Sequence, residues 1–151
     1  MSDLKAHADG PKLKAYLAGP ISGCPDYNIP LFDHVADKLR NIGYEVFNPL
    51  DLSRKWYGDD LQEWKAMSPQ EQRLAYRRLI AAQMHWIAMN ADVMFMLPGW
   101  QRSLGARAES ELAIACEIQR REVPEILLLH DTAKEYPIDH PAPGDLGSVP
   151  L

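Results

Sequence analysis

Residues 97–109, Leu-Pro-Gly-Trp-Gln-Arg-Ser-Leu-Gly-Ala-Arg-Ala-Glu, are the stretch that decides the fold. They follow a short, wholly apolar run, Val93–Leu97, which predicts a buried strand. They lead into an alanine-rich run, residues 106–119, which predicts a helix. We therefore expect a strand-to-helix loop, whose free backbone N–H groups at a positive helix end suit an anion such as phosphate. The small residues expected in this loop are Gly99, Ser103 and Gly105.

Glu109 is expected about one turn into the predicted helix, beside whatever the loop binds. A carboxylate next to an anion site is electrostatically unfavourable unless it has a function. Its neighbours on the same helical face cannot form an ion pair with it; they are Ala106, Leu112, Ala113 and Cys116. A structural alternative is that Glu109 only favours the positive helix end, which is worth about 0.3–1 kcal/mol. Glu111 is a second acidic candidate, and Arg107 lies four residues before it, so spacing alone does not decide between the two.

The composition is that of one ordinary globular domain. The chain has 151 residues, 46% of them hydrophobic, and a formal net charge of −5, which gives no sign of binding to nucleic acid or to an anionic membrane. No apolar run approaches the length of a membrane span, and the polar N-terminus lacks a secretory signal. The two cysteines predict neither a disulfide framework nor a metal site. We expect a cytoplasmic protein that needs no cofactor.

Apolar periodicity and turn residues alternate along the chain, which predicts strands alternating with helices. The expected strands are residues 13–18, 44–47, 92–96 and 125–129. The expected helices begin at Pro30, at the capping box Ser68–Glu71 and at Ala106. Residues 50–67 are expected to form an irregular, aromatic loop. The predicted organisation is a flexible tail over 1–12, one α/β domain over 13–130, and an extended tail rich in proline and glycine over 131–151.

This alternation predicts a three-layer α/β fold of the flavodoxin or Rossmann type, in which a parallel sheet is flanked by helices on both faces. In such sheets ligands bind at the carboxyl ends of the strands. Loops of the chain are expected to meet at this edge; they are Gly19–Asn28, the segment from Asn48 onward, and Pro98–Gly105.

Several short motifs occur in a characteristic order along the chain. They are Tyr16-Leu-Ala-Gly-Pro-Ile21, Phe47-Asn-Pro49, Ala91-Asp92 and Ser103-Leu-Gly-Ala-Arg-Ala-Glu109. Together they resemble the nucleoside 2-deoxyribosyltransferase superfamily, in particular its small phage and bacterial members with a Leu-Pro-Gly-Trp loop. The segment Ser103–Glu109 is also similar to that of deoxynucleoside 5′-monophosphate N-glycosidases. The resemblance covers roughly residues 14–129.

The resemblance implies a covalent mechanism at a glycosidic carbon. Glu109 would be the nucleophile that attacks C1′ of a deoxyribosyl group, and Tyr16 would orient it. Gly19 and Pro20 would line the sugar site, and Ser103 with Gly105 would bind a 5′-phosphate. The other substrate-binding residues are expected to be Ile21, Ser22, Gly23, Asn48, Gln83, Asp92, Pro98, Gly99 and Trp100. The resemblance also implies a homo-oligomer, a dimer or higher, because members of the superfamily build the site across subunits.

Position 83 departs from the pattern of this superfamily. Relatives often carry an aspartate nine residues before the strand-entry aspartate, where it handles the nucleobase, and counting back from Asp92 reaches Gln83. Glutamine can hydrogen-bond a base edge but cannot act as a general acid or base. Either another group protonates the leaving base, or the base leaves without much help, or the chain binds nucleotides without turning them over.

These residues favour an enzyme that hydrolyses the N-glycosidic bond of a (deoxy)nucleoside 5′-monophosphate. Transfer of deoxyribose between bases of unphosphorylated nucleosides is the closest alternative, and a non-catalytic nucleotide sensor is an alternative of another class. A structural or interaction protein is the weakest interpretation, because it does not explain why the loops meet at one sheet edge. The expected partner is a small nucleoside or nucleotide, not a nucleic acid or a membrane.

Overall fold

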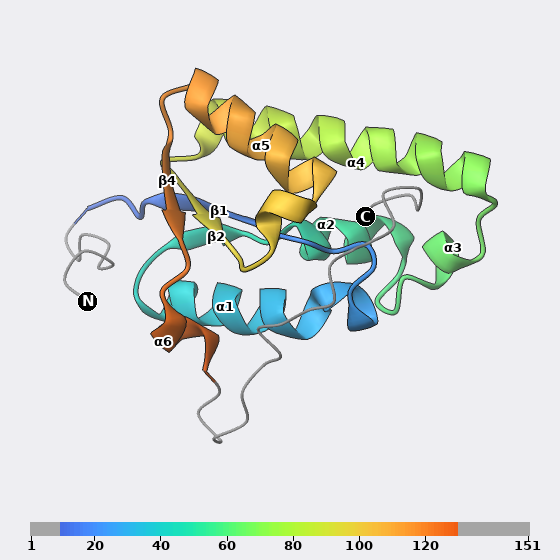
Figure 1. The fold of residues 1–151 in the computed structure, drawn as a ribbon, viewed down its shortest axis with the longest axis horizontal. Coiled ribbons are helices and arrows are strands. Elements are labelled where there is room, and N and C mark those ends of the chain that lie inside the picture. Colours follow the sequence, from blue (N-terminus) through green and yellow to red (C-terminus); the bar gives the residue numbers. More distant parts are fainter. Residues whose placement is uncertain (1–9, 130–151) are drawn as a thin grey trace.

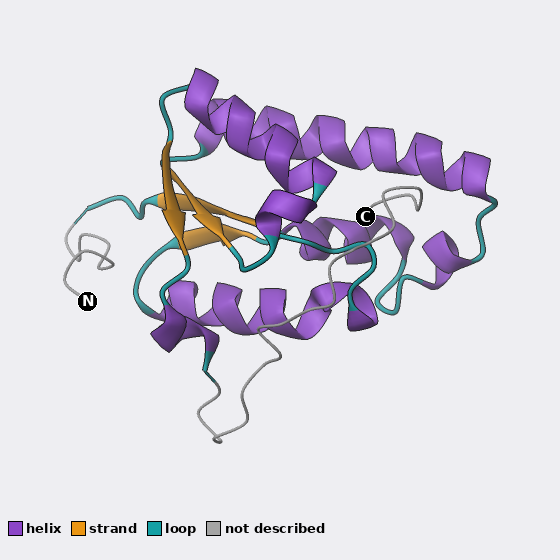
Figure 2. Cartoon of the chain, viewed as in Figure 1, coloured by secondary structure: helices purple, strands orange, loops and turns teal. Residues whose placement is uncertain are grey.

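The computed structural model describes residues 10–129, which contain a four-stranded, wholly parallel sheet (Figure 1). The strands are β1 (Lys14–Ala18), β2 (Glu45–Phe47), β3 (Val93–Met96) and β4 (Gln119–Glu122), in the order β2-β1-β3-β4. The central strand β1 pairs with both neighbours, so that Tyr16 lies opposite Phe47 on one side and Met94 on the other. Helices cover both faces (Figure 2), which confirms the predicted three-layer α/β class.

Alternate residues of the strands face two separate apolar clusters, as the pleat of a strand requires. Ala15 and Leu17 pack into the cluster that includes α1 (Ile29–Asn41) and the short α6 (Glu125–Leu128). Tyr16 and Ala18 pack into the cluster that includes α4 (Pro69–Asn90) and α5 (Leu104–Ala115). The sheet therefore separates an α1 layer from an α4/α5 layer (Figure 1).

Helix α4 begins as the sequence predicts. Ser68 Oγ accepts a hydrogen bond from the Glu71 N–H at 3.2 Å, and a Glu71 carboxylate oxygen accepts one from the Ser68 N–H at 3.1 Å, so the capping box is confirmed. The helix spans 22 residues. Its N-terminal half extends past the carboxyl ends of the strands (Figure 1). Helix α4 therefore covers the edge of the sheet where a ligand is expected.

The prediction of an irregular loop over residues 50–67 is wrong, because this segment is largely helical. It forms α2 (Pro49–Tyr57) and α3 (Gln62–Lys65). Asn48 caps α2 by accepting a hydrogen bond from the Leu50 N–H at 3.0 Å, and Pro49 occupies the first helical position. Leu50, Ser53 and Tyr57 then face the core at helical spacing. The pair Asn48-Pro49 marks a helix start here and not only the end of a strand.

The predicted fourth strand over residues 125–129 is also wrong. The strand is Gln119–Glu122, and Glu125–Leu128 forms the helical turn α6. The apolar run follows Pro124 and buries Leu127 and Leu128 in the α1 layer. The edge strand β4 is mostly exposed and wholly polar, so its sequence lacks the apolar signal by which buried strands are found.

Helix α5 is displaced toward the N-terminus compared with the prediction of residues 106–119. It begins at Leu104 after a short 3₁₀ turn, η3 (Trp100–Arg102), and ends at Ala115. Gly99 lies in the preceding loop with φ of 84°, a conformation that favours glycine. Gly105 is not in the loop but in the first turn of the helix, and Ser103 is its N-cap.

The predicted tails over 1–12 and 131–151 lie outside the described residues, apart from residues 10–12. Between residues 10 and 129, none of the helices combines the length and the apolar character needed to cross a membrane.

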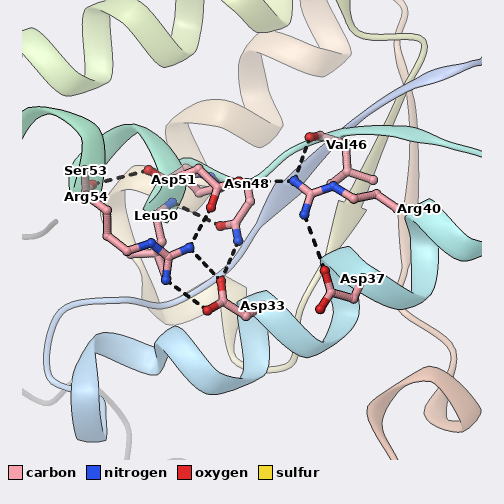
Figure 3. A network of polar contacts seen from close by, with 10 residues as sticks. Asp33, Asp37, Arg40, Val46, Asn48, Leu50, Asp51, Ser53 and Arg54 are labelled. Carbon is pink, nitrogen blue, oxygen red and sulfur yellow. Dashed lines mark hydrogen bonds and ion pairs between the residues drawn. The ribbon is translucent and has the colours of Figure 1, made fainter. Parts of the chain in front are cut away.

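A polar network joins α1, β2 and the start of α2 (Figure 3). The Arg54 guanidinium donates two hydrogen bonds to the Asp33 carboxylate, at 2.8 and 2.9 Å, and the Asn48 side-chain amide donates a third at 3.0 Å. Arg54 also pairs with Asp51 at 2.6 Å. Because bidentate arginine–carboxylate pairs are geometrically specific, the network fixes where α2 begins.

We expect Asp33→Asn to lower the free energy of unfolding by about 1 kcal/mol, since it weakens the bidentate pair with Arg54 at a site that is partly open to solvent. Urea denaturation measures this change. Asp37→Asn is the matched control on the same helix, because Asp37 is 73% exposed and only contacts Arg40 at 3.5 Å. Equal effects of the two substitutions would show that the Asp33 network does not hold α2 in place.

Candidate active site

Glu109 is buried and is held by Tyr16. Glu109 projects from α5 and is 5% exposed, and Tyr16 lies on the central strand β1 and is fully buried. The Tyr16 hydroxyl donates a hydrogen bond to a Glu109 carboxyl oxygen. The Tyr16 ring stacks on Phe47, with centroids 5.4 Å apart, and also contacts Trp86 of α4. The phenol is therefore fixed by neighbours on β2 and α4 before it meets the carboxyl group.

Burial dominates the electrostatics of this pair. Loss of hydration raises the pKa of Glu109 to about 8, although the hydrogen bond from Tyr16 works in the opposite direction. Burial first, and then the negative charge of Glu109, raise the pKa of Tyr16 well above its usual value. Tyr16 therefore remains a proton-bearing donor at neutral pH, while Glu109 is mostly protonated in the free protein.

A small pocket surrounds Glu109 at the carboxyl ends of β1 and β3. Its walls come from β1, the loop after it, the start of α2, α4 and the first turns of α5. The lining residues are Tyr16, Gly19, Ile21, Pro49, Tyr76, Ile80, Gln83, Ser103, Gly105, Ala106 and Glu109. Its accessible volume is about 10 Å³, which is room for roughly one water molecule.

The α4 wall consists of Tyr76, Ile80 and Gln83. Gln83 was predicted only from its position nine residues before Asp92, and Tyr76 and Ile80 were not predicted. Tyr76 and Ile80 lie seven and three residues before Gln83, on the same helical face, so this spacing was the available signal. Gln83 is 5% exposed, and between residues 10 and 129 its amide has no hydrogen-bond partner.

The first turn of α5 presents backbone N–H groups to the pocket. Ser103 Oγ accepts a hydrogen bond from the Ala106 N–H at 3.2 Å, and the Ser103 carbonyl accepts one from Arg107 at 2.9 Å. In the described part of the chain, the N–H groups of Leu104 and Gly105 have no partner. A helix end with unpaired N–H groups is therefore present, one turn before Glu109.

Gly19 and Pro20 shape the loop beside the pocket. A Cβ added to Gly19 would lie 2.7 Å from Cβ of Leu97, so the end of β1 packs too closely on the end of β3 for any side chain. The Pro20 carbonyl accepts a hydrogen bond from the buried Asn28 amide at 2.9 Å. Gly19 and Ile21 line the pocket, whereas Pro20, Ser22 and Gly23 are not among its lining residues.

Several other predicted binding residues lie elsewhere. The Asn48 side chain points to Leu50 and Asp33 and not into the pocket (Figure 3), while its neighbour Pro49 lines it. Asp92 precedes β3, at the opposite edge of the sheet, where its carboxylate accepts a hydrogen bond from the Lys14 N–H at 2.7 Å. A separate pocket beside β4 is lined by Pro98, Gly99 and Trp100.

Glu111 does not share the site of Glu109. It is exposed and lines a different pocket of about 460 Å³, together with Arg107, Arg120 and Trp100. Two residues along a helix differ by roughly 200° in direction, which explains why Glu109 faces β1 and Glu111 faces solvent. Of the two acidic candidates, burial and the contact with Tyr16 therefore single out Glu109.

The match to a protein-family model covers residues 13–120. The chain belongs to the DUF4406 family, which is described as a domain of unknown function. The matched segment of this DUF4406 domain contains every residue that lines the Glu109 pocket. Neither a search of curated proteins nor a search of solved structures gave a significant match. Across residues 10–129, no cluster of three or more acidic, histidine or cysteine side chains has the arrangement to bind a metal ion.

The raised pKa of Glu109 has a consequence for folding stability. Between its ordinary value of 4.5 and about 8, the folded protein retains a proton that the unfolded chain has lost, so the free energy of unfolding should fall as pH rises. Glu109→Gln has no proton to lose at this position. We expect it to be more stable than the wild type by about 2–4 kcal/mol at pH 8.5, with a much smaller difference at pH 5.

Urea denaturation of both proteins at several pH values measures this difference. Glu111→Gln is the matched control, because Glu111 is exposed on the same helix and should leave the wild-type dependence on pH unchanged. Parallel curves for Glu109→Gln and the wild type would contradict a buried, protonated Glu109.

Proposed function

We propose that this DUF4406 domain hydrolyses the N-glycosidic bond of a deoxynucleoside 5′-monophosphate, with Glu109 as the nucleophile. The observation that carries the proposal is the buried Glu109 carboxyl, which accepts a hydrogen bond from Tyr16 in a pocket at the carboxyl ends of the strands. Buried acidic groups with perturbed pKa values are concentrated at catalytic sites.

The resemblance to nucleoside 2-deoxyribosyltransferases supports the proposal. It is more specific about function than the match to the DUF4406 family. The motifs that carry it are distant in sequence, yet Tyr16, Gly19, Ser103 and Glu109 line one pocket. Membership of the superfamily, a homo-oligomeric state and a cytoplasmic location are parts of the proposal, as is a small-molecule substrate.

The chemistry would proceed in two displacements. In the first, an ionised Glu109 oxygen forms a bond to C1′ as the C1′–N bond breaks, and the base leaves with the electron pair and takes up a proton from solvent. In the second, a water oxygen attacks C1′, releases the Glu109 carboxylate and yields the free sugar phosphate and a proton. The positive charge that develops on the sugar favours a nearby carboxylate. Gln83 can hydrogen-bond a base but cannot protonate it.

The spacing along α5 favours a phosphorylated substrate. Gly105 and Glu109 are four residues apart, which corresponds to about 6 Å along the helix. A pentose 5-phosphate spans a comparable length between its anomeric carbon and its phosphorus. The free N–H groups of Leu104 and Gly105 would then meet the phosphate while Glu109 meets C1′. A nucleotide exceeds the present cavity, so its binding requires lining groups to move.

Transfer of deoxyribose to a second base is the nearest alternative. The two reactions share the glycosyl–Glu109 ester and differ only in whether water or a free base then attacks C1′. A non-catalytic nucleotide sensor is the alternative that Gln83 favours. Relatives often carry an aspartate that handles the nucleobase at this position, and glutamine cannot act as a general acid or base. The sensor would bind nucleotide and release no base, whereas the transferase would form a new nucleoside only when a free base is added.

The test of the nucleophile is Glu109→Gln, assayed with the four deoxynucleoside 5′-monophosphates and the four deoxynucleosides, with and without free bases. We expect base release by the wild type and a loss of about three orders of magnitude or more in Glu109→Gln, because the amide cannot attack C1′. Glu111→Gln is the control and should retain activity. No released base and no new nucleoside from any substrate would exclude both enzymatic versions.

The pH dependence offers a second test. The nucleophile must be ionised, and the pKa of Glu109 in the free protein is raised to about 8, so kcat/KM should increase roughly tenfold per pH unit below that value and level off above it. Initial rates between pH 6.5 and 9.5 measure the profile. Over this range the substrate phosphate is already largely dianionic. A rate that is flat or falls over this range would contradict attack by Glu109.

A further inference from the structure

Tyr76 lines the Glu109 pocket but has no role in the proposed reaction. Its hydroxyl reaches the first turn of α5, where a Cβ added to Gly105 would lie 3.2 Å from Tyr76 Oη. Within residues 10–129 this hydroxyl has no hydrogen-bond partner. Tyr76 is half-buried, and within residues 10–129 its hydroxyl is not among the side-chain atoms sealed from solvent without a partner. The unpaired hydroxyl of Tyr76 is therefore available to a ligand above the helix end.

A second observation concerns Gln83, on the same wall of the pocket. Gln83 lies two turns further along α4, is 5% exposed, and also has no hydrogen-bond partner in the described part of the chain. Within residues 10–129 the Gln83 amide is not among the side-chain polar atoms that are sealed from solvent without a partner, so it is open to a molecule in the pocket. The pocket thus contains two unpaired donors from α4, together with Gly105, whose N–H group is also unpaired in the described part of the chain.

The two tyrosines at Glu109 have different hydrogen-bonding states. Tyr16 uses its hydroxyl on the Glu109 carboxyl, whereas Tyr76 does not contact that carboxyl by a hydrogen bond. Burial, and then the negative charge of Glu109, raise the pKa of Tyr76. Tyr76 therefore keeps its proton at neutral pH and can donate it to an anion.

We propose that Tyr76 recognises the phosphate of the substrate: its hydroxyl donates a hydrogen bond to the 5′-phosphate held over the first turn of α5. This inference rests on the proposed function and adds the residue that selects a phosphorylated substrate. Because the phenol now rests against Gly105, it must shift to admit the phosphate and then closes over it. A nucleoside without a phosphate gains nothing from this hydroxyl.

The experiment compares the binding of the four deoxynucleoside 5′-monophosphates with that of the four matching deoxynucleosides. Calorimetry is carried out in the Glu109→Gln protein, so that ligands are not consumed, with and without Tyr76→Phe. We expect Tyr76→Phe to weaken monophosphate binding roughly 10- to 100-fold, as for loss of a hydrogen bond to a charged group, and to leave nucleoside binding unchanged. Tyr57→Phe is the matched control, because Tyr57 is a buried tyrosine that does not line the Glu109 pocket.

The outcomes separate this inference from the proposed function. A selective loss for monophosphates supports Tyr76 as the phosphate-recognising residue, even if the wild type releases no base. Unchanged binding, or an equal loss for nucleosides and monophosphates, overturns it while base release by the wild type leaves the proposed function standing. If neither class of ligand binds, both are wrong.

Discussion

The hydrogen bond from Tyr16 to Glu109 joins the central strand to α5, and the other features of the site depend on it. It is the polar contact through which a carboxyl group can be tolerated in the layer between the sheet and the helices. An unpaired acidic side chain would be strongly unfavourable there, because a buried polar group without a partner loses its hydration and gains nothing in return. Phe47 and Trp86 both contact the Tyr16 ring and also each other, so the geometry of the pair is fixed by packing and not by the bond alone.

The resemblance predicted this pair, because spacing alone left Glu109 and Glu111 open, although both members of the pair also obey local rules. Tyr16 alternates with Ala15 and Leu17 on a strand, which places it on the α4/α5 face of the sheet. Glu109 lies between Ala106 and Ala113 on one helical face, and these small residues allow α5 to approach β1. The parallel alternation of strands and helices then brings both residues to the same sheet edge. For these reasons the fold class and three of the four strands were predictable, whereas the choice of Glu109 over Glu111 rested on the resemblance.

The remaining parts depend on contacts that are distant in sequence. The strand β4 is an edge strand of polar residues, and it is defined only by its pairing with β3. The helix α2 combines a local cap at Asn48 with an arginine pair to Asp33, which lies 21 residues before Arg54. Helical spacing from Gln83 shows which face of α4 Tyr76 occupies, but it does not show that α4 extends past the sheet and brings that face to the pocket. Asp92 belonged to a correctly located strand entry, but the amino end of a strand lies away from the ligand edge.

The protonation state and the closure of the pocket are connected. A cavity that excludes all but about one water molecule is also one that keeps Glu109 dehydrated, and dehydration is the main cause of its raised pKa. A neutral Glu109 does not repel an anion that approaches the free N–H groups one turn away on α5. An ionised Glu109 is required only when positive charge develops on a sugar. Under the proposed function, the closed and neutral state therefore suits capture of the phosphate, and the ionised state suits bond cleavage.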